Sequence, residues 1–167
     1  MRKAAIILLV INCLACSKAQ LGLPRTPHSK ESPDGRFVAF VRNHITVDPP
    51  DQSIWVGHAG ASPRKIERLS ADMDWCSTIE WSADSSTVAF VIRGGRLRVV
   101  DAANGRTLFN EWIVEWHGEY PPAIEIRDLT LSSDGRTARF RGCRAYWRDR
   151  RYGECSEFKT IDITGSQ

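Results

Sequence analysis

The sequence of 167 residues predicts an all-β protein made of three stacked sheets, for three reasons. First, one phrase recurs at a constant spacing: SPDGRFVAFVR begins at Ser32, SADSSTVAFVI at Ser82 and SSDGRTARFRG at Ser132. Second, each phrase ends in β-branched and aromatic residues, which favour strands. Third, no amphipathic helical pattern follows the apolar start of the chain. Self-similarity at a fixed period of this length indicates repeated supersecondary units.

Each copy of the phrase predicts a tight turn that leads into a strand. In the first copy Pro33 fixes φ at the second turn position, Asp34 bonds the local backbone, and Gly35 accepts a positive φ. The middle copy has Ser85 in place of this glycine. The run 37–41 is apolar on both faces, which is typical of a strand between two layers.

The strands after each turn come in the same order in every unit, and we expect ten or eleven in total. The first unit has no clear leading strand and the third has no clear final one. Ala102–Gly105 has the composition of a hairpin turn. Beyond the three phrases, strands are expected at 53–58, 64–70, 76–81, 96–101, 107–116, 123–131 and 158–165.

The middle unit, WSADSSTVAFVIRGGRLRVVDAANGR, resembles a TolB-type, WD-like β-propeller repeat. The positions that match this pattern are Trp81, Ser82, Asp84, Ala89, Phe90 and Asp101. The resemblance covers most of residues 30–165 and implies propeller-type blades of antiparallel strands. TolB-like propellers are protein-interaction platforms, so it also implies binding to another protein, although the family's separate N-terminal domain is missing here.

Three blades are too few for a closed ring, because propellers close with four or more. The second face of the third unit carries Thr137, Arg139 and Arg141, which suit solvent better than another apolar layer. We therefore expect an incomplete or open propeller over residues 30–167, with repeats near 32–81, 82–131 and 132–167.

The first fifteen residues have the features of a secretory signal: Arg2 and Lys3, then an apolar run, then small residues. The segment CLAC, followed by Ser17, resembles the lipobox of bacterial lipoproteins, in which the cysteine receives fatty acids such as palmitate. This implies lipidation at Cys16, a linker over 16–29, and an outer-membrane lipoprotein that faces the periplasm. The alternative is an ordinary signal peptide and a soluble periplasmic protein.

Charge and cysteine content narrow the possible partners. Without residues 1–15 the chain keeps 21 of its 23 basic residues against 20 acidic ones, so nothing in its bulk charge attracts nucleic acid. An oxidising compartment favours disulfides, and we expect Cys143 to pair with Cys155 across a hairpin. Cys76 is then left as a buried thiol, the alternative being a bond between Cys76 and Cys143.

The sequence contains no GxSxG, HExxH, phosphate-loop or EF-hand motif, so we expect a protein that is not an enzyme and uses no metal or cofactor. The four histidines are scattered along the chain. The alternative function is a periplasmic carbohydrate-binding or hydrolytic module, for which Asp48 and Asp51 would be site residues.

Two stretches are candidates for binding another envelope or secreted protein. Arginine and aromatic side chains dominate binding hot spots, and they alternate inside the proposed disulfide loop. The alternative for this loop is an insertion whose aromatic rings pack back on the blades and whose arginines are solvated. The candidates there are Tyr146, Trp147, Arg148, Arg150, Arg151 and Tyr152. The second stretch offers Trp112, Trp116 and His117 as an aromatic wall, although core packing is the favoured interpretation for it.

Overall fold

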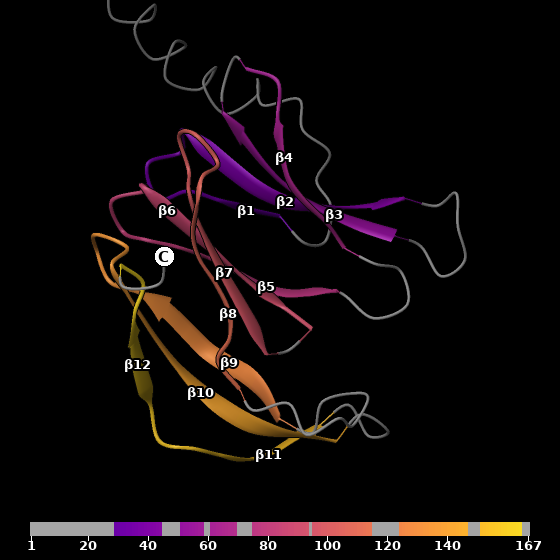
Figure 1. Ribbon diagram of the computed structural model, residues 1–167, viewed down its shortest axis with the longest axis vertical. Coiled ribbons are helices and arrows are strands. Elements are labelled where there is room, and N and C mark those ends of the chain that lie inside the picture. Colours follow the sequence, from indigo (N-terminus) through magenta and orange to yellow (C-terminus); the bar gives the residue numbers. More distant parts are fainter. Residues whose placement is uncertain are drawn as a thin grey trace, which may run out of the picture.

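The computed structural model describes seven ranges of the chain: 29–44, 51–58, 61–69, 75–93, 95–114, 124–146 and 151–164. These residues form twelve strands in three antiparallel sheets, which confirms the predicted all-β class (Figure 1). None of the seven ranges contains a helix, and therefore none contains a helix long and apolar enough to cross a membrane.

The first two sheets each have four strands that follow one another in chain order. The first contains β1 (Ser29–Glu31), β2 (Phe37–His44), β3 (Asp51–His58) and β4 (Arg64–Leu69). The second contains β5 (Cys76–Trp81), β6 (Thr87–Ile92), β7 (Arg96–Asp101) and β8 (Thr107–Trp112). The three-residue strand β1 corrects the expectation that the first unit lacks a leading strand. It was hard to predict because Ser29, Lys30 and Glu31 are all exposed and show no apolar alternation.

The third sheet is narrower than the other two. It contains β9 (Ile124–Leu131), β10 (Thr137–Tyr146), β11 (Arg151–Cys155) and β12 (Lys159–Asp162). Strand β9 pairs with one edge of β10, and both β11 and β12 pair with the other edge. On that edge β12 lies along the first half of β10 and β11 lies along its last residues. Among the described residues the sheet is therefore three strands wide.

The three turns share one hydrogen-bond network. In the first turn the Ser32 hydroxyl donates to Asp34 Oδ1 over 2.8 Å and accepts from the backbone N–H of Phe37 over 3.0 Å. The Asp34 carboxylate also accepts from the backbone N–H of Arg36 over 2.9 Å. The same three bonds recur at Ser82, Asp84, Ser86 and Thr87, and again at Ser132, Asp134, Arg136 and Thr137.

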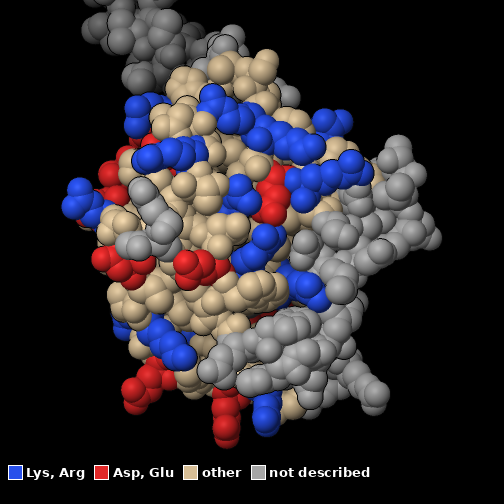
Figure 2. Space-filling view, viewed as in Figure 1, with Lys and Arg blue, Asp and Glu red and all other residues tan. Residues whose placement is uncertain are grey.

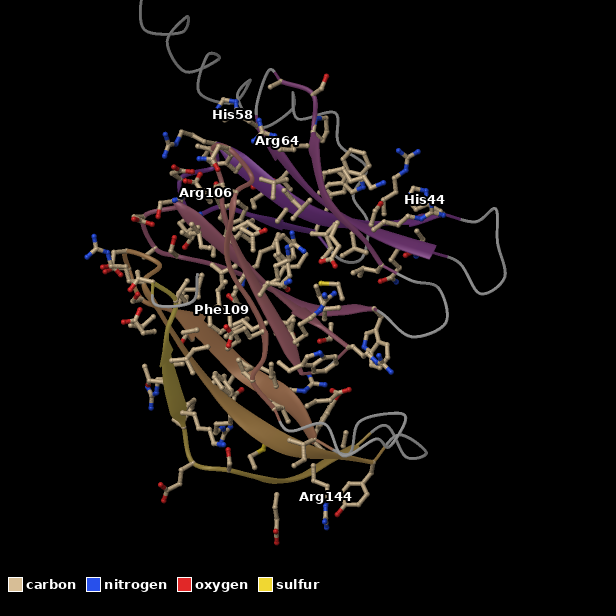
Figure 3. The ribbon with its side chains drawn as sticks, in the orientation of Figure 1. His44, His58, Arg64, Arg106, Phe109 and Arg144 are labelled. Carbon is tan, nitrogen blue, oxygen red and sulfur yellow. A yellow bond between two sulfur atoms is a disulfide. The ribbon has the colours of Figure 1, made fainter. Side chains whose placement is uncertain are left out.

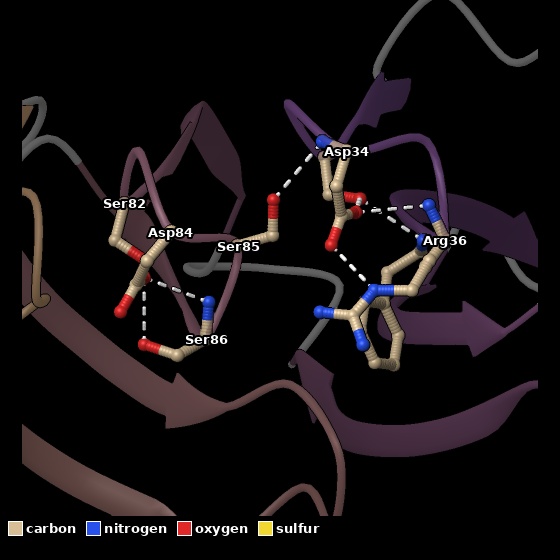
Figure 4. A network of polar contacts seen from close by, with 8 residues as sticks. Asp34, Arg36, Ser82, Asp84, Ser85 and Ser86 are labelled. Atoms are coloured by element: carbon tan, nitrogen blue, oxygen red, sulfur yellow. Dashed lines mark hydrogen bonds and ion pairs between the residues drawn. The ribbon is translucent and has the colours of Figure 1, made fainter.

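The turns also bond to one another across the stack (Figure 4). The backbone N–H of Asp34 donates to Ser85 Oγ over 3.1 Å, and that of Asp84 donates to the Ser133 carbonyl over 3.0 Å. Ser85 has a φ of 62°, close to the 72° and 68° of Gly35 and Gly135. The middle turn thus keeps the left-handed conformation without glycine, and its serine hydroxyl supplies the bond to the first turn.

Two apolar layers separate the three sheets. Val88 and Phe90 on β6 belong to the layer between the first and second sheets, while Ala89 and Val91 belong to the layer between the second and third. Phe140 on β10 belongs to the second of these layers. Strand β6 is therefore buried on both faces, as its sequence predicts, and the sheets lie face to face in chain order.

The contact between the first two sheets also includes a charged cluster. Glu67 on β4 accepts from Arg96 over 2.9 Å and from Arg98 over 2.8 Å, both on β7. All three side chains are less than one fifth exposed, so solvent screens these ion pairs weakly. The pairs fix the lateral position of the first sheet on the second.

Cys76 lies in the layer between the first two sheets as a free thiol, 4% exposed. Burial raises its pKa to about 12, and a hydrogen bond with the Thr78 backbone opposes that rise. The expected buried thiol is confirmed, and the alternative bond to Cys143 is wrong because Cys143 is bonded to Cys155.

Candidate functional site

Exposed aromatic side chains gather on the third sheet. Tyr146, Tyr152 and Phe158 are 43%, 47% and 45% exposed, and all lie on β10, on β11 or between β11 and β12. Trp112, at the end of β8, is the fourth large exposed hydrophobic side chain among the described residues. We call the side of the third sheet that faces away from the second sheet the outer face.

A disulfide holds the hairpin that contributes two of these rings. Cys143 and Cys155 are bonded, and they are also direct partners in the register of β10 and β11. The predicted pairing is therefore present in the structure. Tyr146 packs over Gly153 of the facing strand, where an added Cβ would lie 2.6 Å from Tyr146 Cε2. The disulfide and this contact restrict both strands of the hairpin just before its loop.

Tyr152 is held by an ion pair of a partly exposed Arg127 and a buried Glu125. The Arg127 guanidinium lies 3.6 Å from the centre of the Tyr152 ring, and the Tyr152 hydroxyl donates to Glu125 Oε2 over 2.9 Å. Arg127 also donates to Glu125 over 3.1 Å. Burial raises the pKa of Glu125, which is 3% exposed, and the charge of Arg127 opposes that rise. The Tyr152 ring is thus held by stacking on Arg127, and its hydroxyl is held by the hydrogen bond to Glu125.

Phe158 lies in a second arginine–aromatic stack. The guanidinium carbons of Arg139 and Arg141 are 3.9 Å and 5.0 Å from the centre of its ring. Arg141 also pairs with Asp128, whose φ of 52° coincides with a break in the β9–β10 register. Arg139 is exposed and Arg141 partly so, as expected for a face turned to solvent. These arginines therefore do not only face solvent: they also hold an aromatic ring at the surface of the sheet.

The structure brings together only part of the predicted site. Tyr146 and Tyr152 lie on the third sheet as expected, and Arg144, labelled in Figure 3, marks the same end of β10. Of Arg151 the structure describes the backbone in β11 but not the side chain. The predicted residues that lie outside the described ones are Cys16, Asp48, Trp116, His117, Trp147, Arg148 and Arg150, and of Asp51 only the backbone is described.

Trp112 does not pack in a core, so the favoured interpretation of its stretch is wrong for this residue. Its ring lies over Gly95, where a Cβ would be 3.0 Å away, and the Arg93 guanidinium lies 5.9 Å from its centre. Strand β8 ends at Trp112, so the side chain sits at the edge of the second sheet.

Sequence reasoning missed four residues of this surface. Glu125 and Arg127 alternate with Ile124 and Ile126, and this pattern could have placed the two charged residues on one face of a strand. Phe158 gave no such signal because it lies in the irregular segment between β11 and β12. Asp128 occupies the register break of β9, which an alternating pattern does not reveal.

Within the described residues, no group of three or more His, Cys, Asp and Glu side chains is arranged to hold a metal ion. The outer face presents guanidinium groups of arginine against aromatic rings. Planar guanidinium groups stacked on rings combine a large contact area with directed hydrogen-bond donors. Such a surface suits a protein partner that presents apolar groups and hydrogen-bond acceptors.

No protein-family model matches this sequence, and no curated protein matches it. Among solved structures, the acylaminoacyl peptidase of Pyrococcus horikoshii is similar over 84% of this chain and 24% of that chain, with 15% identity and a TM-score of 0.51. The tricorn protease aligns with 75% of this chain and 12% of that chain at 10% identity (TM-score 0.47). A chain of the mitotic checkpoint complex aligns with 77% of this chain and 50% of that chain at 13% identity (TM-score 0.44).

At these identities the similarities show the fold alone. The chain spans about a quarter of the peptidase chain that it matches. The similarity to the peptidase agrees with the antiparallel sheets, the repeated turns and the face-to-face stacking described above. The protein is an open array of propeller-type blades.

Proposed function

We propose that the protein is a non-enzymatic, protein-binding module of the bacterial cell envelope. The observation that carries this proposal is the pair of arginine–aromatic stacks on the outer face of the third sheet, with Tyr152 and Phe158 about half exposed. Burying such rings against a partner removes apolar area from water, and little ordering is needed because both are already held in place. The TolB-like pattern around Trp81 supports the same conclusion, because repeat scaffolds of this type present rigid surfaces.

We further propose that the chain is exported and attached to the outer membrane through a lipidated Cys16. The support is the sequence CLAC after an apolar run, together with the disulfide between Cys143 and Cys155, since disulfides persist in oxidising compartments. The partner is then another envelope or secreted protein. Two roles fit this arrangement: a scaffold, or an inhibitor that protects the envelope from a secreted hydrolase.

The proposed surface is tested by affinity capture with the full-length chain. The double variant Y152A/F158A removes both stacked rings, and the matched control W112A removes an aromatic of similar exposure on the second sheet. Loss of hot-spot aromatics weakens binding by about 30-fold or more. We expect one discrete envelope partner to be lost with the double variant and kept with W112A, while urea unfolding shows both variants to be folded.

Retention of the partner by Y152A/F158A would refute the outer face as the binding surface. Loss with W112A alone would move the site to the edge of the second sheet. Lipid attachment is tested separately by C16S, which should move the protein from the membrane fraction to the soluble fraction. An unchanged fractionation pattern would contradict lipidation at Cys16.

A further inference from the structure

A second feature lies away from the third sheet, beside the layer between the first two sheets, where the first sheet meets the turn that joins β7 to β8. There a pocket of about 410 Å³ is lined by the start of β2, the end of β3, the start of β4 and residues 102–105. This volume falls in the range of small-molecule sites. The pocket shares no residue with the surface on the third sheet.

The floor of the pocket is apolar and rigid. Phe37, Val56 and Ala102 line it, and each is at most 7% exposed because each also belongs to the layer between the first two sheets. The Phe37 ring is fixed by an edge contact with His58, 4.9 Å between centres, and by Trp81, 6.2 Å away. The floor is therefore formed before any ligand binds, which reduces the ordering cost of binding.

The rim of the pocket is basic. Arg36, His58 and Arg64 supply its ionisable side chains, and no carboxylate lines it among the described residues. Figure 3 shows His58, Arg64 and Arg106 at this end of the molecule, and Figure 2 shows basic side chains over the same end. Of the rim side chains, Arg36 is paired with a carboxylate among the described residues, that of Asp34.

The two arginines differ in how they are held. The Asp34 carboxylate accepts from Arg36 Nε, so the terminal nitrogens of Arg36 remain for a ligand. The stem of Arg64 packs on the β7–β8 turn, where a Cβ on Gly105 would lie 2.7 Å from Arg64 Cδ. None of the ion pairs among the described residues includes Arg64. Arg64 is thus positioned by packing, and its charge has no ion-pair partner in the described part of the chain.

We propose that this pocket binds a small organic anion, in which a carboxylate-type group meets Arg64 and Arg36 and an apolar body lies on Phe37 and Val56. A guanidinium group matches a carboxylate through two parallel hydrogen bonds. The apolar floor sets the second requirement, because an inorganic anion would leave it uncovered.

The proposal is tested by titrating the ¹⁵N-labelled full-length chain and following its backbone amide resonances. N-acetyl-L-leucine is the probe, N-acetyl-L-leucinamide is its uncharged counterpart of the same shape, and inorganic phosphate is an anion without an apolar body. We expect saturable shifts of amides in β3, β4 and residues 102–106 with the acid. Binding of the amide should be about tenfold weaker, because it lacks the charge-assisted hydrogen bonds.

The variant R64Q should weaken binding of the acid about tenfold, whereas the matched control R144Q, on the third sheet, should leave it unchanged. Both arginines are exposed, so the amide spectrum away from the pocket should show that both variants are folded. Equal affinity for acid and amide, affinity for phosphate equal to that for the acid, or the absence of saturable shifts with the acid would each overturn the proposal. None of these results bears on the protein-binding surface of the third sheet.

Discussion

The second and third sheets start from the same turn and strand but differ on one face. In the second sheet β6 is buried on both sides, with Phe90 toward the first sheet and Ala89 toward the third. In the third sheet Phe140 is buried in the same way, but the opposite face carries Arg139 and Arg141 and an exposed Phe158. The turn network is the same in both, so the turn does not determine which faces are covered.

This difference shows that the stack has a direction. The second and third repeats each contribute one apolar face that packs on the preceding sheet, through Phe90 and Phe140. Only the second face varies, and it is apolar where another sheet follows and basic where the stack ends. The surface proposed to bind a partner is thus the face that the repeat pattern leaves without a following sheet.

The largest predicted effect is the difference in stability between removing an aromatic ring from a buried face and removing one from the exposed face. Phe90→Ala removes a side chain with no exposed surface and should lower the free energy of unfolding by about 3–5 kcal/mol. Phe158→Ala removes a ring that is 45% exposed and should lower it by about 1 kcal/mol or less. Urea unfolding followed by circular dichroism measures both values. Similar losses for the two variants would contradict the assignment of buried and exposed faces.

A smaller effect should distinguish the first turn from the third. Gly35 and Gly135 share a left-handed φ, which costs an alanine about 1 kcal/mol. A Cβ on Gly35 would meet no atom within 4 Å, whereas one on Gly135 would collide with the side chain of Thr87 on β6, 2.8 Å from Cγ2. We expect Gly35→Ala to cost about 1 kcal/mol and Gly135→Ala about 3 kcal/mol in urea unfolding. Equal costs would show that the third turn does not pack against the second sheet.

The smallest effect should be a pH dependence that arises in the turns. The backbone N–H of Arg36 holds the pKa of Asp34 well below its usual range, helped by the Ser32 hydroxyl and the Arg36 charge and opposed by burial. The folded pKa lies below the unfolded value of about 3.9, so the stabilisation is complete above about pH 4 and is lost as the pH falls further. The pKa of Asp134 is lowered in the same direction, first by the Ser132 hydroxyl.

In Asp34→Asn, which removes the titrating group, stability should therefore fall less steeply below about pH 4 than in the wild-type chain. Urea unfolding at a series of pH values between about 7 and 3 measures this slope. A variant with an unchanged slope would show that Asp34 contributes nothing to the acid sensitivity of the fold.

Much of the fold could be predicted from the sequence because the repeat is local. The turn needs only a serine, an aspartate two residues later and a left-handed residue, and all three copies show these residues within four positions. The residues of β6 are apolar on both faces of the strand, and this pattern predicts that the strand is buried between two layers. Strand β1 was not predicted because its three residues are exposed and polar, and they form a strand through pairing with β2.

The candidate site was predicted less completely, since it depends on contacts between distant parts of the chain. Tyr152 could be named from the composition of its loop, but the side chains that hold it, Glu125 and Arg127, belong to β9, more than twenty residues earlier. The position of Phe158 between Arg139 and Arg141 follows from the way β11 and β12 share one edge of β10. Neither arrangement has a period that a single sequence displays.

The buried thiol of Cys76 allows separation of the first two sheets to be followed in solution. Thiol reagents attack the thiolate, and a pKa raised to about 12 together with burial leaves Cys76 unreactive while the two sheets are in contact. Alkylation at Cys76, with a Cys76→Ala chain as the blank for other cysteines, therefore reports how often this contact opens under native conditions. A single natural residue thus gives access to the opening rate of one layer without any label being introduced.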